Sequence, residues 1–190
     1  MGTTLTLHGY VNDNILDAMK KITLLVVDVD GTLTDGKITV SGDQEVKSFD
    51  SKDGLGMYLL RAYGVQTAII TGRKSEAVDR RAKELKVDHV IQGAKNKKDA
   101  VNELKEKLGI NTGECACVGD DLNDVPMFEC SDFNACPQDA VAYIKTISTY
   151  ILRSNAGHGA IRELTDLIMI AKGHMNIDGG LKETSRFSKN

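Results

Sequence analysis

Short apolar runs separated by longer amphipathic stretches constrain the fold of this 190-residue chain more than any other feature. Residues 22–29, 65–70 and 115–119 are apolar at most positions, so strands formed there would be buried on both faces. Further short strands are expected at residues 87–93, 133–136 and 149–152. The stretches between the strands have the apolar spacing of helices, which are expected at residues 53–64, 75–86, 97–109, 123–131, 139–147 and 159–173. This alternation predicts an α/β fold, a doubly wound, Rossmann-like, mainly parallel sheet flanked by helices.

The composition indicates one globular domain, since 41% of the residues are apolar and 27% are charged. We expect this domain at residues 1–172 and a polar, mobile tail at residues 173–190. The net charge of −3 speaks against general nucleic-acid binding. No apolar run approaches the roughly 20 residues of a membrane span. Neither nucleic acid nor a membrane is therefore an expected partner.

The cysteines indicate a reducing compartment. Cys115 and Cys117 alternate within an apolar run, which is typical of a buried strand, and Cys130 and Cys136 follow singly. This spacing lacks the paired C-x-x-C pattern of a zinc site. The first residues also lack a basic segment followed by an apolar core, so we expect no signal peptide. We therefore expect reduced thiols and a cytoplasmic protein.

Polar side chains follow four of the expected strands. They are Asp28 and Asp30 after the first strand, Thr71, Gly72 and Arg73 after the second, Lys95, Lys97 and Lys98 after the third, and Asp120, Asp121 and Asp124 after the fourth. Each group alone has an ordinary reading as a turn, a solvated face or a helix start. In a parallel sheet, however, ligands bind at the carboxyl ends of the strands, which share one edge. The four groups together therefore predict one site.

The residue types in this predicted site suit metal-assisted phosphoryl transfer. A phosphate ester repels a carboxylate nucleophile, so a divalent cation must lie between them. Mg²⁺ prefers the oxygen ligands that an aspartate cluster supplies. A phosphorylation-receiver signalling domain is the alternative from another class, because it also combines a doubly wound sheet with acids, a threonine and a lysine. It would need its acceptor aspartate after a later strand and would not need the acid cluster at residues 119–124.

The order of these groups resembles the haloacid dehalogenase superfamily. The motifs that carry the resemblance are Asp28-Val29-Asp30-Gly31-Thr32, Thr71-Gly72, Lys97, and Gly119-Asp120-Asp121 with Asp124. The resemblance covers the chain to about residue 172 and identifies it as a phosphatase or phosphotransferase, because a second aspartate stands at position 30.

The resemblance also implies residue roles. Asp28 would be the nucleophile that forms an aspartyl-phosphate, and Asp30 would be the general acid and base. Thr71 and Lys97 would hold the phosphoryl oxygens. Mg²⁺ would be bound by Asp28, Asp120 and the backbone carbonyl of Asp30. Asp124 would position Lys97 or a metal-bound water, and Asp121 would lie outside the ligand set.

The spacing between the motifs leaves no room for a cap domain. Only a hairpin flap at residues 37–49 and one helix separate Asp30 from Thr71, and only a helix and its strand separate Lys97 from Asp120. The hairpin and residues 50–60, 71–73, 90–93 and 157–163 resemble the capless, tetrameric 3-deoxy-D-manno-octulosonate 8-phosphate phosphatase family. This resemblance implies hydrolysis of a phosphorylated 2-keto-3-deoxy sugar acid on the way to lipopolysaccharide. The alternatives are a phosphatase of nine-carbon, sialic-acid-type 9-phosphates and the phosphatase-like assembly domain of a sialic-acid-activating enzyme.

The same resemblance suggests which residues bind the sugar acid. In the family that the chain resembles, an arginine after Thr-Gly goes with the eight-carbon substrate and a glutamate with a nine-carbon one, so Arg73 favours the eight-carbon substrate, and a guanidinium pairs well with its carboxylate. The remaining expected substrate-site residues are Lys52, Asp53, Gly54, Gly72, Arg81 and Lys97. His158 is either an anion contact at a helix start or an ordinary exposed histidine.

The resemblance further implies a homotetramer. The apolar side chains of the hairpin are Ile38, Val40, Val46 and Phe49. An isolated hairpin is marginal in water, so we expect these side chains to pack against another copy of the chain.

Overall fold

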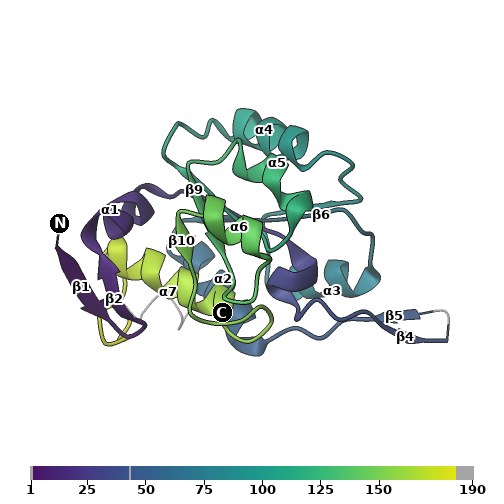
Figure 1. Ribbon diagram of the computed structural model, residues 1–190, viewed down its shortest axis with the longest axis horizontal. Helices are drawn as coiled ribbons and strands as arrows, with labels where there is room; N and C mark the ends of the chain where they lie inside the picture. Colours follow the sequence, from purple (N-terminus) through teal and green to yellow (C-terminus); the bar gives the residue numbers. More distant parts are fainter. Residues whose placement is uncertain (1, 43, 183–190) are drawn as a thin grey trace.

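A six-stranded parallel sheet forms the centre of the computed structural model, which describes residues 2–42 and 44–182 (Figure 1). The strands, in spatial order, are β10 (Tyr150–Ile151), β9 (Phe133–Cys136), β8 (Cys115–Val118), β3 (Leu24–Val27), β6 (Gln66–Thr71) and β7 (His89–Gln92). Every neighbouring pair is parallel. The expected doubly wound parallel sheet is therefore confirmed.

The strand order places a switch point beside β3. The chain runs from β3 to β6 and β7 on one side, and then returns to build β8, β9 and β10 on the other side. Val27 pairs with Ile69 of β6 and Val118 of β8, so the three central strands end nearly level. Ligands bind at such a switch point in doubly wound folds, at the carboxyl ends of the strands.

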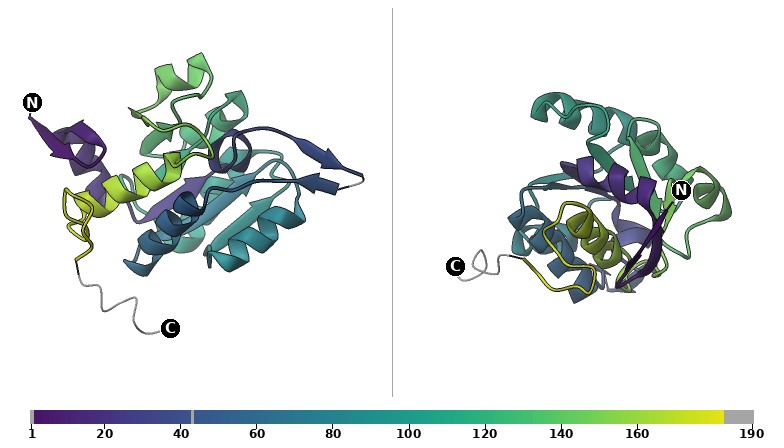
Figure 2. Two further views of the ribbon diagram at one scale, coloured as in Figure 1. Left: turned by 90° about the horizontal axis from the view of Figure 1, so that it is seen from below. Right: turned by 90° about the vertical axis from the view of Figure 1, so that its left-hand side faces the viewer.

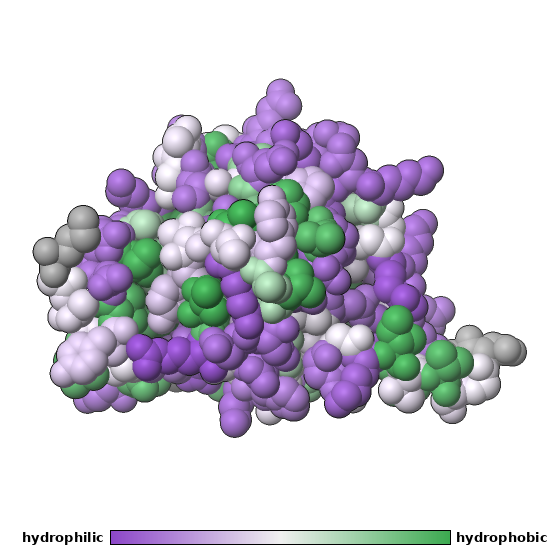
Figure 3. Space-filling view, in the orientation of Figure 1, coloured by the Kyte–Doolittle hydropathy of each residue, from purple (hydrophilic) through white to green (hydrophobic). Residues whose placement is uncertain are grey.

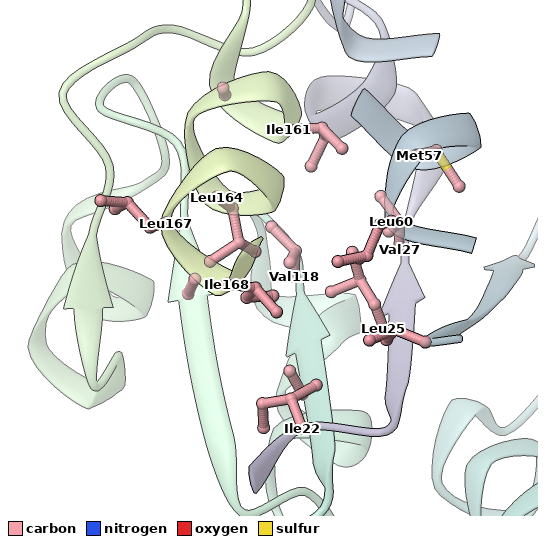
Figure 4. Packing of buried hydrophobic residues seen from close by; sticks show 14 of the residues in the cluster. Ile22, Leu25, Val27, Met57, Leu60, Val118, Ile161, Leu164, Leu167 and Ile168 are labelled. Atoms are coloured by element: carbon pink, nitrogen blue, oxygen red, sulfur yellow. The ribbon is translucent and has the colours of Figure 1, made fainter. Parts of the chain in front are cut away.

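Helices cover both faces of the sheet (Figure 2). On one face lie α1 (Asp13–Lys21), α2 (Ser51–Ala62), α3 (Glu76–Glu84) and α7 (Ala160–Ala171), and on the other lie α4 (Lys97–Leu108), α5 (Val125–Phe128) and α6 (Ala142–Ile147). Successive residues of β3 alternate between the two cores, with Leu25 and Val27 in one and Leu24 and Val26 in the other. Figure 4 shows the first core, where Leu164 and Ile168 of α7 pack over the sheet. This alternation explains why the strand sequences are apolar throughout.

The hairpin flap projects from this body (Figures 1 and 2). It consists of β4 (Thr39–Ser41) and β5 (Gln44–Val46), which pair antiparallel. Its apolar side chains Ile38, Val40 and Val46 are exposed, and apolar atoms are visible on the projection in Figure 3. Phe49 differs from the expectation, because it packs against the core of its own domain. A cap domain could be inserted between Asp30 and Thr71 or between Lys97 and Asp120. In the described residues, the first interval contains only this hairpin and α2 before β6, and the second contains only α4 and β8, so the fold is capless.

The N-terminal segment forms elements that the sequence did not predict. A second hairpin, β1 (Thr3–Thr6) with β2 (Gly9–Asn12), precedes α1. His8 at its turn lies 3.1 Å from Asp166 of α7, measured from Nε2 to Oδ2. The Arg153 guanidinium donates to the carbonyl of Tyr10 at 3.1 Å. The hairpin is thus attached to the domain by these polar contacts and by Val11 of β2, which is buried in the core.

The chain beyond α7 also differs from the expected tail. Met175 is buried and forms a β-bridge with Leu181. The Tyr63 hydroxyl donates to the carbonyl of Lys182 at 2.6 Å, and the Tyr63 ring lies 4.9 Å from the His174 ring. Residues 173–182 therefore pack against the domain, while the rest of the expected tail, residues 183–190, lies outside the described residues. Across the described ranges, the helices are all too short or too polar to cross a membrane.

Candidate active site

Asp28 occupies the first position after β3 and is buried. Its backbone N–H donates to the carbonyl of Val118 at 3.0 Å, which continues the ladder to β8 for one residue past the strand. Its carboxylate accepts a hydrogen bond from Lys97 Nζ at 2.6 Å. The carboxyl end of the central strand thus presents the acid that the sequence predicts as nucleophile.

Lys97 is the first residue of α4 and is buried between two carboxylates. Its ammonium donates to Asp28 at 2.6 Å and to Asp124 at 2.5 Å. Burial lowers the pKa of Lys97, but the charges of Asp28 and Asp124 outweigh burial and raise it. The ammonium therefore remains charged, and the predicted link between Asp124 and Lys97 is present in the structure.

Asp124 is fully buried and has both oxygens occupied. Oδ1 accepts from Lys97, while Oδ2 accepts from the backbone N–H groups of Asp120 at 2.8 Å and Asp121 at 3.3 Å. Asp121 in turn accepts from the N–H of Leu122 at 2.7 Å and begins a 3₁₀ turn at Leu122–Asp124. Asp121 therefore shapes the loop, and its side chain has a local backbone partner.

Three carboxylates gather at this edge of the sheet. Asp28, Asp120 and Asp124 each place one oxygen within 4.8 Å of the others. Burial and then the charge of Asp124 raise the pKa of Asp28 to about 7. Burial, followed by the charges of Asp124 and Asp28, raises the pKa of Asp120 to about 7. Carboxyl groups this close to one another repel when ionised. A hard divalent cation bound between them would offset their negative charges, so the cluster fits a metal site.

A glycine allows Asp120 to reach this cluster. Gly31 has φ of +87°, and a Cβ at that position would lie 2.1 Å from Asp120 Oδ2. The neighbouring Thr32 hydroxyl donates to Asp120 Oδ1 at 3.1 Å. The Gly-Thr pair that follows Asp30 therefore makes room for the Asp120 side chain and donates a hydrogen bond to it.

The Asp30 side chain points to the hairpin flap. Its Oδ1 accepts from Lys47, whose side chain is only 3% exposed. Its Oδ2 is buried without a hydrogen-bond partner in the described part of the chain, and Arg73 Nε lies 3.9 Å away. The Asp30 carboxylate is thus held by the flap and is not a member of the three-aspartate cluster.

Thr71 ends β6, the neighbour of β3, and is buried. Its hydroxyl oxygen accepts from the backbone N–H of Arg73 at 3.4 Å. Gly72 and Arg73 follow directly after β6, and both are exposed. The second strand therefore brings a hydroxyl and a guanidinium to the same edge as the acids.

Comparison with known proteins agrees with this geometry. The family described as haloacid dehalogenase-like hydrolase matches residues 51–132. The 3-deoxy-D-manno-octulosonate 8-phosphate phosphatase of Escherichia coli K12 is 37% identical over 172 residues, covering 90% of this chain and 92% of that protein. The chain belongs to the 3-deoxy-D-manno-octulosonate 8-phosphate phosphatase family.

Solved structures of this phosphatase family share the fold. The crystal structure from Yersinia pestis matches with a TM-score of 0.88 at 34% identity, covering 90% of this chain and 94% of that chain. The structure from Moraxella catarrhalis, in complex with a magnesium ion, a phosphate ion and a KDO molecule, matches with a TM-score of 0.83 at 40% identity, covering 86% and 95%. The expected superfamily and the capless phosphatase family are confirmed, and a magnesium-bound relative supports the metal expected at the acid cluster.

Two residues expected in the substrate site of this phosphatase family, Asp53 and Gly54, have structural partners within the domain. Asp53 is buried and accepts from the backbone N–H groups of Gly159 at 3.3 Å and Arg162 at 2.7 Å, so it caps α7. Gly54 is also buried, and a Cβ there would lie 2.2 Å from the guanidinium of Arg81. Both residues therefore fix the packing of α2 against its neighbours, which the sequence motif did not reveal.

Lys52, Arg81 and His158 differ in how far they reach the surface. Lys52 is exposed at the start of α2. Arg81 lies in a groove of about 700 Å³ between the flap and α3 and pairs with Glu84 at 3.0 Å. His158 is exposed on the loop before α7. That loop touches the active-site loop, because the N–H of Gly157 donates to the carbonyl of Thr32 at 3.3 Å.

Sequence reasoning missed Lys47 and Glu45 as site residues. Both lie on the flap, far in sequence from the four motifs. Lys47 pairs with Asp30 and with Glu45, and Glu45 pairs with Arg73. The alternation of charged and apolar residues at 45–47 was the available signal, because it places both charges on one face of a strand.

Proposed function

We propose that this chain is a magnesium-dependent phosphomonoesterase that hydrolyses 3-deoxy-D-manno-octulosonate 8-phosphate, a precursor for lipopolysaccharide. The observation that carries the proposal is the buried Asp28, bonded to Lys97 at 2.6 Å beside Asp120. A carboxylate held by a buried ammonium at the end of the central strand is a positioned nucleophile. The chain's 37% identity to a phosphatase of this name supports the choice of substrate.

The residues around Asp28 divide the remaining tasks. Asp28 attacks the phosphorus in line and forms an aspartyl-phosphate, while Lys97 and Thr71 hold the phosphoryl oxygens. Asp30 gives a proton to the leaving sugar alkoxide and later takes one from the water that hydrolyses the intermediate. Asp28, Asp120 and the backbone carbonyl of Asp30 would hold Mg²⁺, which when bound neutralises charge on the carboxylates and the phosphoryl group.

The surroundings of the site suit a sugar acid. The groove between the flap and α3 is lined by Lys47, Lys74, Arg80 and Arg81, together with three glutamates. Arg73 pairs with Glu45 of this lining, lies 3.9 Å from Asp30 and is half exposed. A guanidinium at this position can pair with the carboxylate of an incoming sugar acid.

Phosphate release from a panel of esters tests this proposal. Purified protein with Mg²⁺ is given octulosonate 8-phosphate, a nine-carbon sialic-acid-type 9-phosphate and p-nitrophenyl phosphate. We expect the highest kcat/KM for the eight-carbon ester and no release by Asp28→Asn. A clear preference for the nine-carbon ester would contradict the substrate, and no release from any ester would contradict the activity.

We further infer a homotetramer that works in the cytoplasm. Ile38, Val40 and Val46 are 55%, 68% and 46% exposed on the flap, which is unusual for apolar side chains that have no partner. Packing of the flaps of several copies would cover them and place a neighbour near each active site. All four cysteines are free thiols, which supports a reducing compartment. Light scattering of the purified protein tests the assembly, and a fully active monomer would contradict it.

A further inference from the structure

Four charged side chains form a closed ring at the mouth of the active site. Lys47 binds both Asp30 and Glu45, the second at 2.8 Å between Nζ and Oε1. Glu45 also binds the guanidinium of Arg73, and Arg73 Nε lies 3.9 Å from Asp30. Positive and negative charges alternate around the ring, and its net charge is zero.

The geometry of the flap explains why Glu45 reaches this position. Residues 45 and 47 lie on one face of the strand, and Val46 between them points away and is exposed. Val40 pairs with Glu45 across the hairpin. Lys47 is almost completely covered, whereas Arg73 is 48% exposed. The ring therefore has a fixed side at Lys47 and an accessible side at Arg73.

We propose that Glu45 is an internal carboxylate ligand of Arg73 that the carboxylate of the substrate displaces. This inference rests on the proposed function, in which Arg73 receives the carboxylate of a sugar acid. Glu45 binds Nη2 of Arg73 and Asp30 lies on the Nε side, so the Nε/Nη2 edge of the guanidinium is occupied, and a substrate carboxylate that binds this edge competes with Glu45 for the same donors. A phosphate ester without a carboxylate cannot make the exchange, and Glu45 then stays on Arg73. Glu45 is thus a specificity-determining residue on the flap.

The strength of this competition follows from the exposure of the pair. A partly exposed ion pair contributes about 0.2–1 kcal/mol, which corresponds to an equilibrium constant for closure of about 1.4 to 5. The apparent dissociation constant of a competing carboxylate is therefore multiplied by one plus that equilibrium constant. Removing the charge of Glu45 should therefore tighten the binding of a sugar acid about two- to sixfold.

Calorimetry with the free sugar acid tests the exchange without requiring turnover. The dissociation constant of 3-deoxy-D-manno-octulosonate is measured, in the presence of Mg²⁺ and phosphate, for wild type, Glu45→Gln, Arg73→Ala and the double variant. Glu106→Gln, on the exposed surface of α4, removes the same charge elsewhere and is the matched control. The methyl ester of the sugar acid has no charge to exchange and is the control ligand.

We expect Glu45→Gln to bind the sugar acid two- to sixfold more tightly, with no such gain for the methyl ester. In the Arg73→Ala background, Glu45→Gln should change the dissociation constant less than 1.5-fold. Equal or weaker binding by Glu45→Gln would overturn the proposal, as would a gain that persists without Arg73 or that Glu106→Gln reproduces. If octulosonate 8-phosphate is not hydrolysed but the gain is found, the proposed function fails and the exchange stands. If the ester is hydrolysed without the gain, only the exchange fails.

Discussion

Replacing Asp120 by asparagine should make the metal-free protein more stable at alkaline pH. The variant keeps the shape of the side chain and an oxygen that can accept from the Thr32 hydroxyl, which now donates to Asp120 at 3.1 Å. What it removes is one negative charge from the cluster with Asp28 and Asp124. Residues that bind a metal are thus expected to reduce stability when the metal is absent.

The direction follows from the pKa of Asp120, which burial and the neighbouring acids raise from 3.8 to about 7. A carboxyl group with a higher pKa in the folded than in the unfolded state binds more protons when folded. Folding is then favoured below pH 3.8, and this stability is lost as the pH rises through about 7. The difference corresponds to about 4 kcal/mol, and we halve it to about 2 kcal/mol because Asp120 is partly exposed.

Thermal unfolding at several pH values measures this effect. A change of about 2 kcal/mol should raise Tm by about 4 to 8 °C for a chain of this length, at pH 8 with a chelator present. The difference should become small near pH 4, where the wild-type carboxyl is protonated in the folded state and close to half protonated in the unfolded state, and should disappear well below pH 3.8. Magnesium at ten times its dissociation constant should stabilise the wild type by about 1.4 kcal/mol and leave Asp120→Asn unchanged.

A lower Tm for metal-free Asp120→Asn than for wild type at pH 8 would refute the electrostatic argument. So would an increase in Tm of equal size at pH 4 and pH 8, because that would show a packing effect without proton linkage. Asp121→Asn is the matched control, since its side chain binds a local backbone N–H outside the cluster.

Three further predictions concern other parts of the site. Asp28→Asn should reduce phosphate release to below a tenth of the wild-type rate with an unchanged circular-dichroism spectrum, because only the nucleophile is lost; retention of more than a tenth would contradict the mechanism. Exhaustive chelation should abolish hydrolysis. The apparent affinity for Mg²⁺ should rise with pH through about 7, because Asp28 and Asp120 lose protons there, and calorimetry in buffers of different ionisation enthalpy measures how many protons are released on binding. Asp53→Ala should cost about 1–2 kcal/mol of unfolding free energy in urea melts through loss of the α7 cap, and a changed KM without loss of stability would show that Asp53 binds substrate instead.

Much of the candidate site could be predicted from the sequence because Asp28, Thr71 and Asp120 lie at the ends of strands or within two residues after them. Once the apolar runs are taken as parallel strands, Asp28, Thr71 and Asp120 must share one edge of the sheet. Lys97 needed the family resemblance as well, because three lysines stand near the end of the third strand. The structure selects Lys97, since it is the first residue of α4 and is buried against two acids.

Features that depend on distant contacts could not be predicted. The N-terminal hairpin is held by the buried Val11 and by polar contacts to α7 and Arg153, which leave no periodic pattern. Asp53 stands in a motif that the resemblance assigns to substrate, but its partners are backbone groups more than 100 residues away. The pairing of Glu45 with Arg73 likewise joins residues 28 positions apart through the orientation of the flap. The spacing of residues in the sequence determines neither which distant helix a side chain caps nor the angle at which a hairpin leaves the domain.

The arrangement of partners assigns different tasks to the three clustered aspartates. Asp124 has one oxygen on Lys97 and the other on two backbone N–H groups, so its charge is already compensated. Asp28 shares the same ammonium through one oxygen only. Among the residues that the structure describes, Asp120 accepts from one hydroxyl, that of Thr32, which offsets its charge only weakly. Two incompletely compensated carboxylates match the charge of one divalent cation, which explains why Asp28 and Asp120 suit metal binding while Asp124 holds the lysine.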